Sequence, residues 1–270
     1  MITKDASTEA TNLEIISDIL NYIKTTAEGS HHYITNAHYD RLKYTAEYLE
    51  TSLDRSDTIL DIGSFPYFLP AYLSLKGFNN IRTIEIPRID DFPLCPTWSF
   101  TSIQLDIEEA SLPFEDNSVD VILLLEVFEH LYRRPNQVFR ELHRILKPEG
   151  KLVISTPNGG RLQSYVKALF RKQFGPKIYT WSEIYEGLGH FSHIREYSLE
   201  EIEEYLRHFD FYIEKASRLS FYQLENPYTS GMKRLIYSTY RTIAKFLFFV
   251  PIIQNTIFLV AQNRKSDIIS

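Results

Sequence analysis

The stretch at residues 58–69, TILDIGSFPYFL, constrains the fold of this chain more than any other, because an apolar run ends there in a glycine turn. Ile59 and Leu60 give the run the character of a short buried strand. Gly63 permits backbone angles that other residues resist, and Pro66 suits the first turn of a following helix. In an open α/β sheet, ligands bind at the edge where parallel strands end and the strand order reverses. The stretch therefore predicts a ligand site at the carboxyl end of a parallel strand.

Apolar runs alternate with helical periodicities along the rest of the chain. We expect further strands at residues 81–86, 102–107, 119–125, 151–156, 211–218 and 256–261, and helices at 13–23, 39–53, 135–146, 160–172, 199–206 and 235–249. The nearly uniform apolarity of residues 119–125 is typical of a strand that helices cover on both faces. Strands that alternate with helices predict an α/β fold with a doubly wound, mostly parallel sheet.

The composition narrows the class of protein. A chain of 270 residues with 44% hydrophobic content can bury a core, and a net charge of −6 gives no overall basic field, which disfavours a nucleic-acid partner. Cys95 is the only cysteine and cannot form an internal disulfide, while the N-terminal residues lack the apolar core of a secretory signal. We therefore expect a cytoplasmic protein.

One apolar stretch, residues 246–253, lies close to several basic side chains between residues 233 and 245. It is interrupted by Pro251 and is far shorter than the roughly 18 residues that cross a bilayer. A helix packed on the sheet is the favoured interpretation, and contact with a membrane surface through 233–253 is the alternative.

The glycine turn is compatible with two classes of cofactor. A dinucleotide site needs Gly-x-Gly-x-x-Gly, but Phe65 and Phe68 occupy the second and third glycine positions, so pyrophosphate binding is disfavoured. The turn instead resembles motif I of class I S-adenosylmethionine-dependent methyltransferases, Asp-x-Gly-x-Gly-x-Gly. Asp61 and Gly63 match that motif, whereas Phe65 and Tyr67 stand where the family has glycine. An ordinary strand–helix turn without a ligand is the other interpretation.

Three longer segments make this resemblance more specific. LPFEDNSVDVILLLEVFEHL, RELHRILKPEGKLVISTPN and GHFSHIREYSLEEI, in this order, resemble the core of the ubiquinone-type and glycan-modifying O-methyltransferase branch. The resemblance implies a Rossmann-like sheet of seven strands with an antiparallel last strand. The helical periodicity before the first strand predicts an N-terminal helical segment at residues 1–56 that acts as a lid or cap. We expect the methyltransferase domain at 57–270, with an insertion around 160–197.

Cofactor residues follow from spacing and from the resemblance. Glu85 stands 24 positions after Asp61, at the expected tip of the neighbouring strand, where an acidic residue can accept both ribose hydroxyl protons of an adenosine cofactor. A salt-bridged carboxylate is the alternative role for Glu85. The resemblance implies that Asp61, Gly63, Ser64 and Phe65 line the methionine end of S-adenosylmethionine, that Asp106 and Ile107 frame the adenine, and that Glu126 completes the cofactor site.

Acidic residues and histidines follow the fourth expected strand. Glu126, Glu129 and His130 form an E-x-x-E-H pattern where the methyl acceptor is expected, and His190 and His193 come from the insertion. The pattern resembles the metal site of ubiquinone-pathway O-methyltransferases and of small-RNA 3′-end 2′-O-methyltransferases, which implies a divalent metal held by Glu126, Glu129, His130 and His193.

Metal-free roles are equally open for these side chains. His193 or His190 can act as a general base, because an imidazole accepts protons near neutral pH, and His130 and Glu129 are further catalytic candidates. Glu129 or His130 can also simply cap a helix or pair with an arginine.

The sequence thus predicts a methyltransferase that uses S-adenosylmethionine to methylate a hydroxyl of a sugar, glycan precursor or small metabolite. One alternative is 2′-O-methylation of an RNA terminus, and another is a methyltransferase-like scaffold without catalysis. The acceptor and the oligomeric state stay open.

Overall fold

The computed structural model of the chain describes residues 6–26, 36–87, 93–161, 195–221 and 254–265. The helices are α1 (Ala6–Thr26), α2 (Asn36–Ser52), α3 (Phe68–Leu75), α4 (Pro135–Ile145) and α7 (Leu199–His208), with a short 3-10 helix η2 (Phe128–His130). The strands are β1 (Thr58–Ile62), β2 (Asn80–Glu85), β3 (Thr101–Gln104), β4 (Val119–Leu125), β5 (Leu146–Pro157), β6 (Phe211–Leu219) and β7 (Thr256–Asn263).

The strands form one seven-stranded sheet in the order β3-β2-β1-β4-β5-β7-β6. Strands β1 to β5 pair in parallel, whereas β7 runs antiparallel to both β5 and β6. The predicted fold class, a mostly parallel doubly wound sheet with an antiparallel last strand, is therefore confirmed. The strand order reverses between β1 and β4, so the carboxyl ends of these two strands flank the position where such sheets bind ligands.

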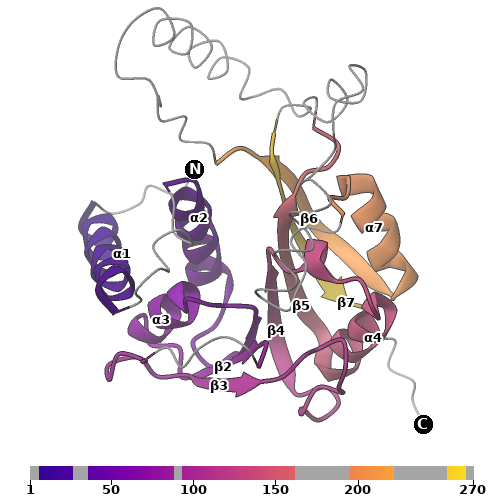
Figure 1. Cartoon of the computed structure of the whole chain (residues 1–270), viewed down its shortest axis with the longest axis horizontal. Coiled ribbons are helices and arrows are strands. Elements are labelled where there is room, and N and C mark those ends of the chain that lie inside the picture. The colour runs from indigo at the N-terminus through magenta and orange to yellow at the C-terminus, as the bar shows by residue number, and fades with distance from the viewer. Residues whose placement is uncertain (1–5, 27–35, 88–92, 162–194, 222–253, 266–270) are drawn as a thin grey trace, which may run out of the picture.

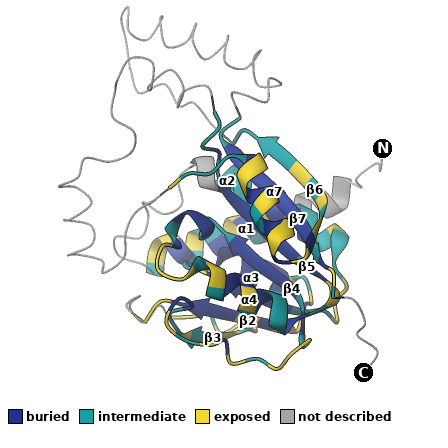
Figure 2. Ribbon diagram, turned by 90° about the vertical axis from the view of Figure 1, so that its right-hand side faces the viewer, coloured by how far each residue is buried: buried dark blue, intermediate teal, exposed yellow. Residues whose placement is uncertain are grey.

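Helices cover both faces of the sheet. Figure 1 shows α1, α2 and α3 on one face and α4 and α7 on the other. Neighbouring residues of a strand point to opposite faces, so Ile59 packs in the apolar cluster under α1–α3 while Leu60 packs in the cluster under α4 and α7. Figure 2 shows the central strands in the buried colour and the outer surface of α7 in the exposed colour.

Two local predictions were wrong. The expected strand at 102–107 ends at Gln104, because the Asp106 carboxylate accepts a hydrogen bond from the Glu108 N–H (2.9 Å) and turns the chain. Pro66 lies before helix α3 and not in its first turn. The Tyr67 N–H donates to the Ser64 carbonyl (2.7 Å), so Pro66 belongs to a separate turn that precedes the helix.

The expected helix at 199–206 is confirmed, and it begins with a capping box. The Ser198 side chain accepts from the Glu201 N–H, and the Glu201 carboxylate accepts from the Ser198 N–H in return.

Several other expectations lie largely or wholly outside the described residues. They are the helices at 160–172 and 235–249, the insertion, and the apolar stretch at 246–253. Within the described residues, no helix combines the length and apolarity that crossing a membrane requires.

Candidate active site

The turn after β1 has a backbone conformation and a close contact that favour glycine. Gly63 has φ 71°, in the left-handed region, and its N–H donates to the Ile84 carbonyl (2.9 Å). A Cβ atom at this position would lie 2.6 Å from Cγ2 of Val127, closer than real Cβ contacts come. The strand β1, the strand β2 and the segment after β4 therefore meet at Gly63, at the reversal of strand order.

Tyr67 takes a glycine-like conformation at a motif position where the methyltransferase pattern has glycine. Its φ is 69°, which is strained for a residue with a side chain. The side chain is 4% exposed and packs with Phe100, at a ring-centre distance of 5.5 Å, in the cluster under α1–α3. Tyr67 therefore adopts a backbone conformation that glycine adopts more readily.

Asp61 is a buried carboxyl at the end of β1. It is 2% exposed, and no described residue donates to it. Its cross-strand neighbour Thr83 is fully buried, and among the described residues the Thr83 hydroxyl has no partner either. Burial, followed by the nearby charge of Glu85, raises the Asp61 pKa well above its ordinary value. Unsatisfied buried polar groups are rare in proteins, so the unpartnered Thr83 hydroxyl beside the buried Asp61 carboxyl marks a place for a ligand.

Glu85 braces the glycine turn from the end of β2. Its Oε1 accepts hydrogen bonds from the Ser64 N–H (2.7 Å) and the Ser64 hydroxyl (2.6 Å). Burial raises the pKa of Glu85 to about 7, although the hydrogen bonds from Ser64 and from the Phe65 N–H act in the opposite direction. The resemblance placed Ser64 at the methionine end of the cofactor; the contact of Ser64 with Glu85 was not expected. The ribose role of Glu85 stays a prediction.

The loop after β3 runs along the same edge of the sheet. The Leu105 N–H donates to the Glu85 carbonyl (2.8 Å), which holds the start of this loop against β2. Ile107 is 8% exposed and packs in the cluster under α4 and α7, whereas the Asp106 carboxylate stays partly exposed and pairs with Arg133. The two residues predicted to frame adenine therefore lie at the carboxyl edge, and Arg133 is a neighbour that sequence reasoning missed.

Glu126 follows β4 with a left-handed backbone, φ 58°. Its carboxylate accepts from the Ser155 hydroxyl (3.0 Å) and pairs with Nη1 of Arg41 (3.1 Å), which also donates to the Ser155 hydroxyl (3.2 Å). Arg41 comes from α2, so an N-terminal helix is fastened to the carboxyl ends of β4 and β5. Arg41 was missed because its sequence position, far from any motif, gives no signal of this contact.

Glu129 lies on the other side of the sheet from Glu126. It is fully buried on η2, and its Oε2 accepts from the Thr156 hydroxyl (2.8 Å). Ser155 and Thr156 are neighbours on β5 and point to opposite faces, so the carboxylates that they bind are separated by the sheet.

The structure therefore does not support the predicted metal set. His130, Glu126 and Glu129 do not gather around one point, and within the described part of the chain no three His, Cys, Asp or Glu side chains are placed to hold a metal ion. His193 and His190 lie outside the described residues, so their roles stay predictions.

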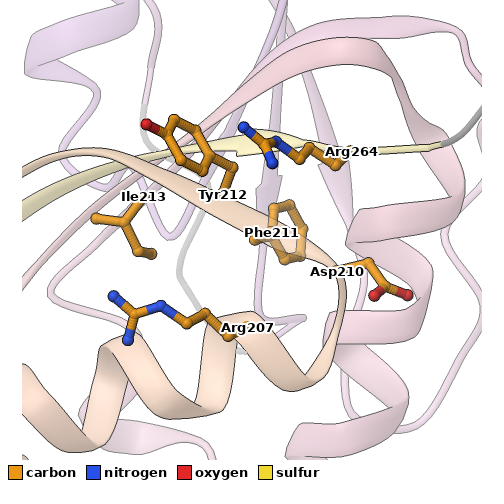
Figure 3. A pocket seen from close by; sticks show the side chains of 6 residues that line it. All are labelled: Arg207, Asp210, Phe211, Tyr212, Ile213 and Arg264. Atoms are coloured by element: carbon orange, nitrogen blue, oxygen red, sulfur yellow. The ribbon is translucent and has the colours of Figure 1, made fainter.

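A pocket of about 340 Å³ lies at the amino edge of the sheet, where the parallel strands begin. The candidate site lies at the opposite, carboxyl edge, where these strands end. It is lined by Arg207, Asp210, Phe211, Tyr212, Ile213 and Arg264. Figure 3 shows Tyr212 and Arg264 above the β6 ribbon and Ile213 and Arg207 below it, and the Arg264 guanidinium lies 3.9 Å from the Tyr212 ring centre. The two guanidinium groups do not converge on one ligand, and this pocket is separate from the candidate active site.

Comparisons with known proteins agree with this fold. A methyltransferase domain family matches residues 89–154, which run from the loop before β3 to the carboxyl half of β5. The structure also aligns with 1,6-didemethyltoxoflavin-N1-methyltransferase of Burkholderia thailandensis, with a TM-score of 0.55 and 14% identity, over 98% of this chain and 93% of that chain. The chain has the class I methyltransferase fold.

Curated relatives with higher sequence identity match shorter parts of this methyltransferase-fold chain. The biotin biosynthesis bifunctional protein BioHC of Cellvibrio japonicus is 35% identical over 127 residues, which are 45% of this chain and 24% of BioHC. A probable S-adenosylmethionine-dependent methyltransferase of Mycolicibacterium smegmatis is 45% identical over 49 residues, which are 18% of this chain and 19% of that protein. The chain therefore spans about a quarter or less of the length of these relatives.

The cofactor that this fold implies, S-adenosylmethionine, fits the described residues. Its methionine end carries an ammonium group, which is the kind of donor that the buried Asp61 carboxyl lacks. The missing side chain at Gly63 keeps the turn tight beside that carboxyl, and Glu85 and Asp106 supply acceptors farther along the same edge. The donors of the cofactor and the acceptors of the site are thus complementary.

Proposed function

We propose that this protein is an S-adenosylmethionine-dependent methyltransferase. The observation that carries the proposal is the pair of buried carboxyls, Asp61 and Glu85, which lie beside the glycine turn on adjacent parallel strands and have no ion-pair partner among the described residues. Buried carboxyls without such a partner are costly to a fold, and a ligand with matching donors offsets that cost. The match of a methyltransferase domain family to residues 89–154 supports the same proposal.

Each carboxyl has a separate role in this proposal. Asp61 accepts from the ammonium group of the cofactor, and Glu85 accepts from the ribose hydroxyls while its other contacts hold the Ser64 turn in place. Asp106 and Ile107 frame the adenine from the loop after β3. The bound cofactor supplies an electrophilic methyl group on a sulfonium.

We further propose that the acceptor is a hydroxyl of a small metabolite or sugar. Transfer to a hydroxyl requires alignment of the acceptor oxygen, exclusion of water and removal of one proton. His130 on η2 is the described imidazole next to the end of β4, and it is half-buried. We assign His130 the removal of the hydroxyl proton, with His193 and His190 as the candidates outside the described residues. Arg41 and Ser155 hold the Glu126 carboxylate at the same edge.

The scaffold alternative stays open. It was suggested by aromatic residues at two glycine positions of the motif. Tyr67 adopts the glycine-like backbone and buries its ring, whereas Phe65 does not have a positive φ. No contact of the described residues favours an RNA terminus as the acceptor over a small hydroxyl compound.

A methyl-transfer assay tests the proposed function. The protein is incubated with S-adenosylmethionine and a panel of sugars, sugar nucleotides, phenols and short RNAs, and the release of S-adenosylhomocysteine is followed together with the mass of the product. We expect a product that is 14 mass units heavier, as one added CH₂ requires, with the methyl on oxygen in an acceptor of the small-molecule group. Product from the short RNAs alone would favour the RNA alternative, and no transfer to any acceptor despite cofactor binding would favour the scaffold.

A further inference from the structure

Hydrogen bonds join the loop after β3 to the segment before α4. Carboxylates of the loop accept them, and N–H groups of the segment donate them. Glu108 is 4% exposed, and its Oε1 accepts hydrogen bonds from three successive backbone N–H groups. The donors are Tyr132 (3.0 Å), Arg133 (2.7 Å) and Arg134 (2.8 Å). A carboxylate with three backbone donors fixes both pieces of chain relative to each other, because each such charge-assisted bond is stronger than a neutral one.

The Arg133 side chain adds ion pairs between the same two pieces of chain. Its guanidinium contacts Asp106 and Glu109, and its Nε lies 3.6 Å from the Glu108 carboxylate. All three acidic residues belong to the first part of the loop that follows β3, so a single side chain bridges residues 106–109. The flat fork of a guanidinium is suited to such bridging, whereas an ammonium acts as a point charge.

The Asp106 carboxylate is oriented by two partners. One oxygen accepts the Glu108 N–H within its own loop (2.9 Å), and the other is bound by Arg133. Each carboxylate oxygen can accept about two hydrogen bonds, so the group keeps acceptor capacity while its rotation is restricted. The side chain is 23% exposed, so part of it is accessible from the carboxyl edge.

We infer that Arg133 is a positioning residue that holds Asp106 toward the 6-amino group of the cofactor's adenine and so sets the preference for adenine over bases without that group. This inference rests on the proposed function, since Asp106 accepts a hydrogen bond from the amino group only if the ligand is an adenosine compound. Arg133 itself does not touch the base in this account. Its effect passes through the fixed orientation of Asp106.

The other end of α4 offers a matched control. Arg144 lies in the last turn of the helix and has a side-chain exposure of 31%, against 34% for Arg133. It binds Glu141 (2.8 Å) and Asp116 (2.7 Å), in a network of similar kind, but at the amino edge of the sheet. The variants R133Q and R144Q therefore each remove one bridging guanidinium from the same helix region, at opposite edges.

The test is calorimetric titration of wild type, R133Q and R144Q with S-adenosylhomocysteine and with its analogue that carries purine in place of adenine. We expect wild type and R144Q to bind the adenine compound about tenfold to a hundredfold more tightly than the purine compound, as one charge-assisted hydrogen bond allows. We expect this ratio to fall to about threefold or less in R133Q. A loss of folding alone would weaken both ligands without changing their ratio.

The outcomes separate this inference from the proposed function. An unchanged ratio in R133Q, or a wild type that binds both compounds equally, would overturn the inference and leave the methyltransferase proposal standing. A wild type that binds neither compound would overturn both. If R133Q does not fold, R133K replaces it, because a lysine keeps the charge but cannot bridge the three carboxylates. An affinity ratio of the adenine to the purine compound in R133K equal to that of wild type would also overturn the inference.

Discussion

The amino and carboxyl edges of the sheet hold their carboxylates in different ways. At the amino edge, Asp120 accepts from Nζ of Lys147 (2.7 Å) and from the Thr58 N–H (2.9 Å), and Arg144 binds two carboxylates. At the carboxyl edge, Asp61 lies buried without a donor from any described residue. The Asp120 carboxylate at the amino edge is satisfied by the protein itself, whereas the Asp61 carboxyl at the carboxyl edge leaves an acceptor for a ligand.

This difference shows how one fold can combine stability with binding. Paired groups at one edge need no ligand, so their removal affects only folding. Buried groups without ion-pair partners at the other edge destabilise the ligand-free protein. Binding of a ligand that donates to these groups restores the lost free energy. Substitutions at the amino edge should therefore change stability alone, whereas substitutions at the carboxyl edge should also change ligand binding or its dependence on charge.

The largest expected effect compares two glycines in left-handed conformations. Gly63 lies at the carboxyl edge with a Cβ position 2.6 Å from Val127, whereas Gly77 at the amino edge (φ 86°) has nothing within 4 Å of its Cβ position. Gly77→Ala should lower the free energy of unfolding by about 1 kcal/mol, the cost of the backbone conformation alone. Gly63→Ala should lower it by about 3 kcal/mol, because an overpacking clash adds to that cost.

Denaturant unfolding of the two variants measures this difference. Circular dichroism can follow both transitions, and the wild-type slope with denaturant checks that unfolding stays cooperative. Equal losses in the two variants would show that the turn at Gly63 has room for a side chain, and the close approach to Val127 would then be wrong.

The next effect concerns the charge of Glu85 in the ligand-free protein. Its pKa is about 7 in the folded chain, against an ordinary value of 4.5, so the folded state holds the proton more tightly than the unfolded state. The stability from this group is complete below about pH 4.5 and is lost as the pH rises through about 7. Glu85→Gln cannot ionise, so its stability relative to wild type should increase between pH 5 and pH 8 by up to about 3 kcal/mol.

Unfolding of wild type and Glu85→Gln at several pH values gives this difference directly. Titrating groups that do not interact with Glu85 act in both proteins and cancel in the comparison. Asp61 is the exception, because the Glu85 charge helps to raise its pKa and Glu85→Gln removes that contribution. A difference that does not change between pH 5 and pH 8 would mean that Glu85 ionises normally, and the contrast between the edges would be weaker.

The smallest effect is expected at the amino edge. Lys147→Met removes the ion pair with Asp120, in which the lysine side chain is 42% exposed. Exposed pairs contribute little, so the free energy of unfolding should fall by about 1 kcal/mol or less, and the affinity for S-adenosylhomocysteine should not change. Thermal unfolding and ligand titration of the same sample measure both. A changed ligand affinity would contradict the separation of the two edges.

Much of the fold could be predicted from the sequence, because local pattern and global structure agree. The strand β4 and the helix α7 both appear where they were expected. The turn at Gly63 was also identified, since its left-handed backbone favours glycine and Val127 lies too close for a side chain. Tyr67 shows where the pattern fails, because a strained aromatic residue there depends on packing against Phe100 that no local signal reveals.

The candidate site was harder to predict because its contacts are long-range. Arg41 reaches Ser155 across 114 positions of sequence, and Arg133 meets Asp106 across 27. The E-x-x-E-H spacing suggested that Glu126 and Glu129 act together. The left-handed backbone at Glu126 ends the strand, however, and the two carboxylates bind residues that point to opposite faces of β5. Spacing alone cannot show such a change of direction.

The central claim is that the buried carboxyls at the carboxyl edge hold an adenosine cofactor, and calorimetric titration with S-adenosylhomocysteine tests it most directly. We expect one site in wild type and, in Glu85→Ala, an affinity lower by about tenfold to a hundredfold, because charge-assisted hydrogen bonds to the ribose are lost. A thermal unfolding curve shows whether the variant is folded. Undetectable binding to wild type at millimolar ligand, or an unchanged affinity in folded Glu85→Ala, would contradict the claim.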